Sequence, residues 1–182
     1  MRKAESTCPL RIPGAALYGR SSPRIFTPPL GPLTPDTSLG YSLIEFVETV
    51  ADAHLLPWEQ ELAIRALELD ESGGRLRFRT VILLVARQNG KSTFAQMLSL
   101  WAMYLIGVGL VIGTAQDLDI AEELWSGCVD IAESVDDLAA LITNVNKVNG
   151  KKALEVEYPG AHGSVVKRSE EHTSELQSLG RI

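Results

Sequence analysis

Residues 85–92 read VARQNGKS, and this stretch decides the fold. The apolar run RTVILLV at residues 79–85 leads into it and predicts a buried strand, while residues 92–106 read as a helix that is apolar on most sides. Strand, loop and helix in this order, with Gly-Lys-Ser at the junction, form the pattern of a phosphate-binding loop. The full pattern G-x-x-x-x-G-K-[ST] is met except at its first position, where Val85 replaces glycine.

The 85–92 loop therefore carries the candidate ligands for ATP and Mg²⁺. Backbone N–H groups in such a loop face the phosphates, the ammonium of Lys91 meets the β- and γ-phosphate oxygens, and the hydroxyl of Ser92 ligates Mg²⁺. An ordinary turn before a helix is the alternative, because Gly-Lys-Ser also occurs in unrelated loops. The candidate nucleotide-binding residues of this region are Ala86, Arg87, Gln88, Asn89, Gly90, Lys91, Ser92 and Thr93.

Length and composition limit the class of protein. A chain of 182 residues, 45% of them hydrophobic, is long enough for one domain with a real core. The net charge of −6 means that the chain lacks the overall excess of positive charge that is typical of nucleic-acid-binding proteins. Cys8 and Cys128 are the only cysteines, so there is no disulfide framework or cysteine-based metal site, which fits a reducing cytosol. The N-terminus lacks the charged-then-apolar pattern of a signal peptide.

The N-terminal region differs in composition from the rest of the chain. Residues 1–36 hold seven of the nine prolines and several arginines, with no apolar periodicity. We expect them to form an extended arm with little core of its own. Its positive charges are those of a solvated tail or of a DNA-binding arm. Helical spacing begins after it, in an apolar face at Leu43, Phe46, Val47 and Val50 and in a second helix that starts at Pro57.

Short apolar runs predict a parallel sheet around the loop. Residues 75–78 and 80–85 read as strands before it, and residues 110–114 (LVIGT) read as a buried parallel strand after its helix. This order makes a βαβ unit, so the expected fold class is α/β: a partial P-loop NTPase fold of the RecA-like type, with a truncated parallel sheet and flanking helices. Further along are a helix over residues 120–129, a weaker one over 136–142, and a hairpin of residues 153–157 and 163–166.

A membrane-anchored interaction protein is the alternative from another class. Residues 93–116 contain no charged side chain, and about 20 apolar residues can cross a bilayer. Gln96, Ser99 and the break at residues 107–109 interrupt the stretch, and a helix sandwiched against a sheet is also expected to be this apolar. We therefore expect no membrane partner.

Several segments together resemble the large terminase subunit of tailed bacteriophages, the ATPase and nuclease that packages viral DNA. The resemblance covers residues 34–167, which are expected to hold the N-terminal part of its ATPase domain, residues 37–167. A helicase-like P-loop ATPase fragment is the alternative within the same class. The matching segments are residues 55–58 (LLPW), 77–80 (RFRT), the variant loop VARQNGKS, 111–125 (VIGTAQDLDIAEELW) and 149–152 (NGKK) with the hairpin that follows.

The resemblance implies roles for Arg87, Trp58 and Gln60. Arg87 corresponds to the basic residue of the family's deviant loop and is the candidate catalytic residue, stabilising charge at the γ-phosphate; pairing with a surface carboxylate is its alternative role. The family carries Pro-Trp-Gln before the loop to contact adenine, whereas this chain has Pro-Trp-Glu-Gln, so Trp58 and Gln60 are candidates and either Gln60 takes the role or the contact is lost. Trp58 is the more typical core residue. Gln116 is expected to sense the nucleotide or to cap the next helix.

The family also implies partners and a location. These are double-stranded viral DNA, the portal protein, the small terminase subunit and other copies of the same chain in a ring, in the cytoplasm of the bacterial host. No apolar run ending in Asp-Glu follows the hairpin, so the Walker B aspartate, the catalytic glutamate and the acidic nuclease cluster are missing from this sequence. Hydrolysis of ATP by this chain alone is therefore not expected.

The C-terminal residues are expected to have an origin other than the natural gene. Residues 168–178 read RSEEHTSELQS, which resembles the translation of a common sequencing-library adapter. We expect residues 168–182 to be a non-native tail that ends a gene fragment, and a genuine polar tail is the alternative. The natural gene would then continue after residue 167.

Overall fold

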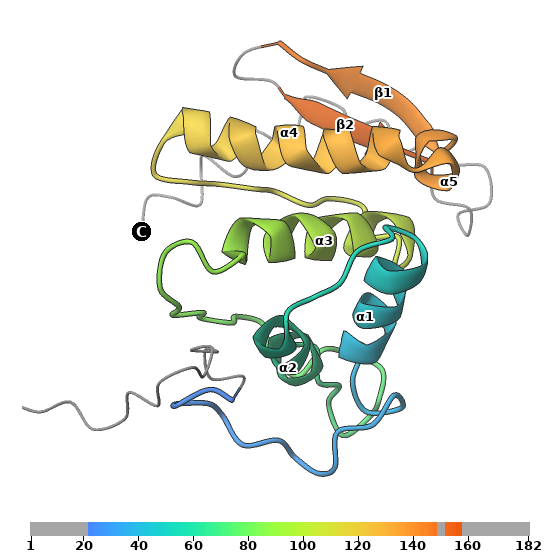
Figure 1. Cartoon of the computed structure of the whole chain (residues 1–182). Helices are drawn as coiled ribbons and strands as arrows, with labels where there is room; N and C mark the ends of the chain where they lie inside the picture. The colour runs from blue at the N-terminus through green and yellow to red at the C-terminus, as the bar shows by residue number, and fades with distance from the viewer. Residues whose placement is uncertain (1–21, 149–151, 158–182) are drawn as a thin grey trace, which may run out of the picture.

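The structure is a computed structural model that describes residues 22–148 and 152–157. One helix lies at the centre of this part of the chain. The elements in chain order are α1 (Gly40–Thr49), α2 (Pro57–Ala66), α3 (Lys91–Tyr104), α4 (Leu118–Ser134), α5 (Asp136–Ala139), β1 (Ile142–Asn146) and β2 (Ala153–Val156). The central helix is α3, which lies between α4 and the pair formed by α1 and α2 (Figure 1). The β1–β2 hairpin lies beyond α4.

Helices α1 and α2 pack closely because a glycine stands where they meet. A Cβ atom placed on Gly40 would lie 2.4 Å from backbone atoms of Ala63 and Ile64, so no side chain fits there. Ser38, fully buried just before α1, donates its hydroxyl proton to the Ile64 carbonyl oxygen at 2.6 Å and adds a polar contact to the same junction. The side chains that α1 buries include Leu43, Phe46 and Val47, as their helical spacing predicts.

The helix boundaries follow local signals in the sequence. Helix α2 begins at Pro57, where the missing N–H of proline costs nothing. Helix α4 begins after Asp117, whose carboxylate accepts the N–H of Asp119 at 3.0 Å. The N-cap of α4 is therefore Asp117 and not Gln116.

Helix α3 buries more core side chains than any other described element. It runs from Lys91 to Tyr104, which confirms the helix predicted after the loop. Tyr104 donates its hydroxyl proton to the Leu138 carbonyl at 3.3 Å, and burial raises its pKa to about 12. On the facing side of α4, burial raises the pKa of Cys128 to about 11, so this thiol stays protonated at neutral pH. The side chains that α3 buries are Phe94, Met97, Leu100, Trp101 and Tyr104.

The hairpin differs from the predicted one. The weaker helix predicted over residues 136–142 ends at Ala139, and Ile142 begins β1 instead. Strand β1 pairs antiparallel with β2, with Val145 opposite Leu154. The β-branched residues of the sequence ITNVN favour an extended strand over another helical turn. The predicted partner, residues 163–166, lies outside the described residues, as does the tail at residues 168–182.

The segments expected to form the parallel sheet do not pair with one another among the described residues. Within residues 22–148 and 152–157, residues 80–85 and 110–114 belong to no strand, and residues 75–78 contribute one isolated bridge, between Leu69 and Leu76. Ile82 and Leu84 are 81% and 91% exposed. An apolar run becomes a strand only when a neighbouring strand accepts and donates its backbone hydrogen bonds. The parallel-sheet fold class therefore remains a proposal.

The uncharged stretch at residues 93–116 is divided between two kinds of structure. Its first part belongs to α3, which ends at Tyr104, and its second part turns at residues 105–109 and continues to α4 without helix or strand. Among the described residues, none of the helices has both the length and the apolar character needed to cross a membrane.

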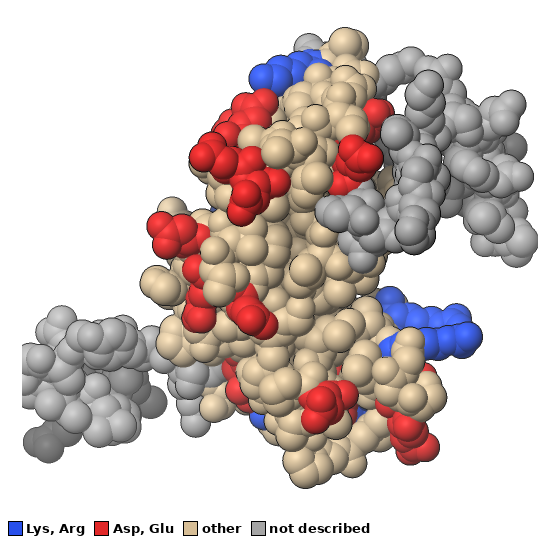
Figure 2. Space-filling view, turned by 90° about the vertical axis from the view of Figure 1, so that its right-hand side faces the viewer, with Lys and Arg blue, Asp and Glu red and all other residues tan. Residues whose placement is uncertain are grey.

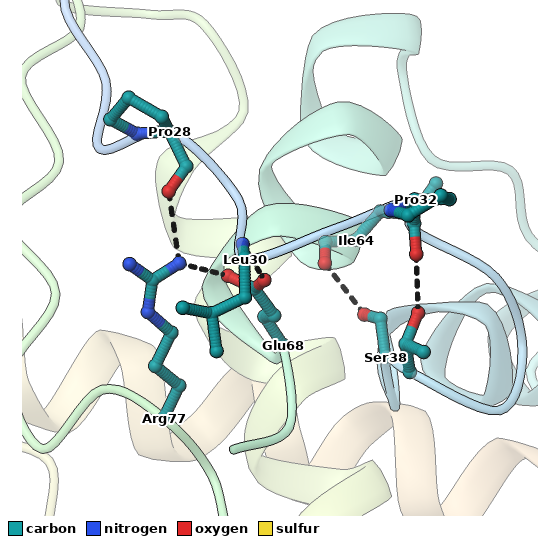
Figure 3. A network of polar contacts seen from close by, with 8 residues as sticks. Pro28, Leu30, Pro32, Ser38, Ile64, Glu68 and Arg77 are labelled. Atoms are coloured by element: carbon teal, nitrogen blue, oxygen red, sulfur yellow. Dashed lines mark hydrogen bonds and ion pairs between the residues drawn. The ribbon is translucent and has the colours of Figure 1, made fainter. Parts of the chain in front are cut away.

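Polar contacts hold the described end of the N-terminal arm against the helices (Figure 3). Glu68 is 3% exposed, and its carboxylate accepts the N–H of Leu30 at 2.7 Å. The same carboxylate pairs with Arg77 at 2.6 Å, and Arg77 also donates to the Pro28 carbonyl at 2.9 Å. Residues 22–36 contain no helix or strand, as expected of an extended arm, and these contacts show how part of it is anchored.

Candidate nucleotide-binding site

The 85–92 loop makes a sharp turn that depends on left-handed backbone conformations. Gln88 has φ of 60° and Gly90 has φ of 82°. Gly90 is the N-cap of α3, and the side-chain amide of Asn89 donates to the Arg87 carbonyl at 3.2 Å. Glycine adopts such a conformation without strain, so the Gly-Lys-Ser junction is suited to lead from an extended segment directly into a helix.

The N-terminus of α3 has features of an anion-binding site. No side chain forms a cap hydrogen bond there, and the first N–H groups of any helix have no intrahelical acceptor. Ser92 and Thr93 are exposed in this first turn. Free N–H groups and the positive end of the helix dipole together favour a phosphate at this position.

Lys91 lies folded over its own loop. Its ammonium donates to the Ala86 carbonyl at 2.7 Å and to the Val85 carbonyl at 3.4 Å. The positive charge is therefore held against the carbonyl groups at the start of its own loop. In the phosphate-binding loop pattern, the lysine at this place in the sequence contacts the β- and γ-phosphates.

A buried carboxylate, that of Glu59, lies against the loop at Gly90. Glu59 is 3% exposed, and its Oε2 accepts the N–H of Leu56 at 2.8 Å at the start of α2. Its Oε1 lies 2.4 Å from where a Cβ atom on Gly90 would stand. Burial raises the pKa of Glu59 above its ordinary value, and the hydrogen bond from Leu56 partly opposes this effect. No local pattern in the sequence identifies the contact of Glu59 with Gly90, because it joins segments far apart in the chain.

Trp58 and Gln60, the two candidate adenine contacts, each contact other residues of the protein. The ring of Trp58 lies 6.5 Å from that of Phe94, and its indole N–H is buried without a hydrogen-bond partner among the described residues. Gln60 donates its side-chain amide to the Leu55 carbonyl at 3.1 Å. Trp58 therefore packs on α3 as a core residue does, and Gln60 is occupied at the start of its own helix.

An apolar cavity of about 250 Å³ lies between α2, α3 and the extended segment before the loop. It offers no polar side chain with which to read a nucleotide base. The side chains that line it include Leu62, Ala66, Phe78, Val81, Phe94 and Leu98.

Arg87 is exposed at the tip of the loop. Within residues 22–148 and 152–157, no carboxylate pairs with its guanidinium and no hydrogen bond restrains its side chain. Pairing with a surface carboxylate, the alternative role for Arg87, is therefore not seen in this part of the chain.

The 85–92 loop differs in charge from the acidic parts of the face drawn in Figure 2. Asp and Glu side chains spread over the upper and middle parts of the face in Figure 2, where Lys and Arg are few. Acidic side chains of α4 and α5 include Asp130, Glu133, Asp136 and Asp137. In contrast, the 85–92 loop carries only the positive charges of Arg87 and Lys91.

A magnesium ion at this site would depend on the nucleotide. In the described part of the chain, no cluster of three or more His, Cys, Asp or Glu side chains is placed to hold a metal. The Ser92 hydroxyl is the single protein ligand that the loop pattern supplies, and Mg²⁺ commonly completes its shell with phosphate oxygens and water. The residues present thus fit a metal that arrives with ATP.

Comparisons with protein-family models, with curated proteins and with solved structures find no match to this chain.

Proposed function

We propose that this chain binds ATP–Mg²⁺ at the 85–92 loop and is the nucleotide-binding part of a DNA-packaging ATPase of the large-terminase type. The observation that carries the ATP-binding step is the placement of Lys91, whose ammonium lies inside a turn at the uncapped N-terminus of α3. The packaging role rests on the sequence resemblance over residues 34–167.

Different residues of the loop hold different parts of the nucleotide. The N–H groups of Gly90 and the first turn of α3 donate to phosphate oxygens, and Lys91 exchanges its contact with Ala86 for the β- and γ-phosphates. Ser92 presents its hydroxyl to Mg²⁺, which neutralises charge that develops in phosphoryl transfer. Arg87 then stabilises the γ-phosphoryl group from the tip of the loop.

Binding without appreciable hydrolysis is the expected activity of this chain. Phosphoryl transfer to water needs a residue that positions the water, and this sequence has no apolar strand ending in Asp-Glu. The whole packaging ATPase would act in the cytoplasm of the bacterial host. It would work there as a ring of copies on double-stranded viral DNA, with the portal protein and the small terminase subunit.

Calorimetry with ATP in the presence and absence of Mg²⁺ tests the proposal. We expect weak, saturable binding at one site that tightens with Mg²⁺, and no binding of adenosine, because the loop recognises phosphates. A folded chain that binds neither ATP–Mg²⁺ nor inorganic tripolyphosphate would contradict the proposed function. Circular dichroism of the same sample shows whether the chain is folded.

Replacing Arg87 by alanine is expected to act on turnover and not on binding. In the complete ATPase that the proposal implies, Arg87→Ala lowers kcat by about 100-fold or more, because the arginine contacts the phosphoryl group chiefly in the transition state. The Kd for ATP–Mg²⁺ changes by about twofold at most, and Arg87→Lys gives an intermediate kcat because its charge lacks the planar fork. Steady-state kinetics measure both constants. An unchanged kcat would remove Arg87 from the mechanism.

A further inference from the structure

The two helices that start near the 85–92 loop share one buried carboxylate. Glu59 belongs to the first turn of α2 and accepts the N–H of Leu56 with its Oε2 at 2.8 Å. Its Oε1 lies against Gly90, the N-cap of α3, at 2.4 Å from the position of a Cβ atom. The backbone of the loop can approach the carboxylate this closely only because residue 90 has no side chain.

Among the described residues, no cationic side chain pairs with the Glu59 carboxylate. Glu61 and Arg65, the other charged side chains of α2, pair with each other at 2.6 Å. Lys91 points its ammonium at the Ala86 carbonyl, with no ion pair to Glu59. Removal from water raises the pKa of Glu59, which shows that its surroundings disfavour the negative charge.

A negative charge at this point has an electrostatic consequence for the loop. The N-terminus of a helix attracts anions within its first turn. Glu59 already places an anion against the N-cap of α3, so a phosphate bound there would experience its repulsion. The repulsion grows with the negative charge of the ligand and decreases with added salt.

We propose that Glu59 is a positioning residue that fixes Gly90 and whose charge weakens the binding of highly charged phosphates at the 85–92 loop. This inference rests on the proposed function. It goes further because Glu59, a residue outside the loop, would make the site discriminate between nucleotides of different charge.

The test compares Glu59→Gln with the wild type and with Glu61→Gln. Glutamine keeps an acceptor for the N–H of Leu56 and the shape of the side chain, and removes only the charge. Glu61→Gln removes the same charge two positions along the same helix, from a side chain that is partly exposed and paired with Arg65. Calorimetry with ATP–Mg²⁺, ADP–Mg²⁺ and adenosine, each at low and high salt, gives the affinities.

We expect Glu59→Gln to tighten ATP–Mg²⁺ binding about two- to fivefold at low salt, since charges at a helix terminus contribute on this scale. The gain is smaller for ADP–Mg²⁺, absent for adenosine and reduced at high salt. Glu61→Gln leaves all three affinities unchanged. Chemical denaturation gives an independent readout: Glu59→Gln is expected to fold at least as stably as the wild type, because a desolvated charge is removed.

Unchanged or weaker ATP–Mg²⁺ binding by Glu59→Gln would overturn the inference, as would an equal gain in Glu61→Gln. If the wild type binds ATP–Mg²⁺, Lys91→Ala does not, and Glu59→Gln equals the wild type, the inference alone fails and the proposed function stands. If the wild type binds neither ATP–Mg²⁺ nor tripolyphosphate, both fail.

Discussion

Replacing Lys91 by alanine is expected to weaken ATP–Mg²⁺ binding by about 100-fold, which removes measurable binding from a weak site. The variant loses the only ammonium of the loop, and hydrogen bonds that involve a charged group contribute about 1.5–3 kcal/mol each. Alanine has the highest helix propensity, so the first turn of α3 is retained. Calorimetric titration of the wild type and the variant under identical conditions measures the difference.

A second lysine provides the matched control for this experiment. Lys147 is exposed directly after β1, and Lys147→Ala removes the same charge from the hairpin end of the molecule. We expect it to leave the Kd for ATP–Mg²⁺ unchanged. Equal affinities in the wild type and in Lys91→Ala would show that the 85–92 loop is not the nucleotide site. The melting temperature of each variant separates loss of binding from loss of folding.

Replacing Gly40 by alanine is expected to have the largest effect on stability. The new methyl group would stand 2.4 Å from the carbonyl carbon and oxygen of Ala63 and from the Cα of Ile64, all of them backbone atoms that cannot rotate away. Helices α1 and α2 must separate, at a cost of about 3 kcal/mol, the upper end of what inserted core atoms usually cost. The higher helix propensity of alanine returns at most about 1 kcal/mol. Urea denaturation followed by circular dichroism gives the free energy of unfolding.

Gly127 in α4 is the control for the Gly40 experiment. A Cβ atom there would lie 2.0 Å from the side-chain amide nitrogen of Gln96, which can rotate out of the way. Among the described residues, the one hydrogen bond of this amide is long, 3.5 Å to the Leu124 carbonyl. We expect Gly127→Ala to be close to neutral, because the gain in helix propensity offsets the displaced amide. Equal destabilisation by the two substitutions would contradict the close α1–α2 contact as the cause.

The helices could be predicted from the sequence because their signals are local. Pro57 at the first position of α2, Asp117 before α4 and the Gly-Lys-Ser junction before α3 each act within one helical turn of the boundary that they set. The apolar faces of α1 and α3 follow from the helical period alone. These elements lie where the residue pattern places them, within a few residues.

Strand pairing and the support of the loop could not be predicted in this way. The run at residues 80–85 resembles a buried strand in composition, but a strand needs a partner that the pattern does not identify. The sequence predicts a helix that reaches Ile142, the first residue of β1. Nothing in the neighbouring residues indicates that this strand pairs with β2. The contacts of Glu59 with Gly90 and of Glu68 with Leu30 and Arg77 join segments far apart in the chain.

The contacts of Lys91 with the Val85 and Ala86 carbonyls also have a calorimetric consequence under the proposed function. In this structure the ammonium already has two acceptors, so a phosphate oxygen would replace a carbonyl oxygen instead of meeting a bare cation. The enthalpy of that exchange is the difference between two hydrogen-bonded states, and we therefore expect it to be small. The loop would thus compete with the proposed ligand for its own ammonium group.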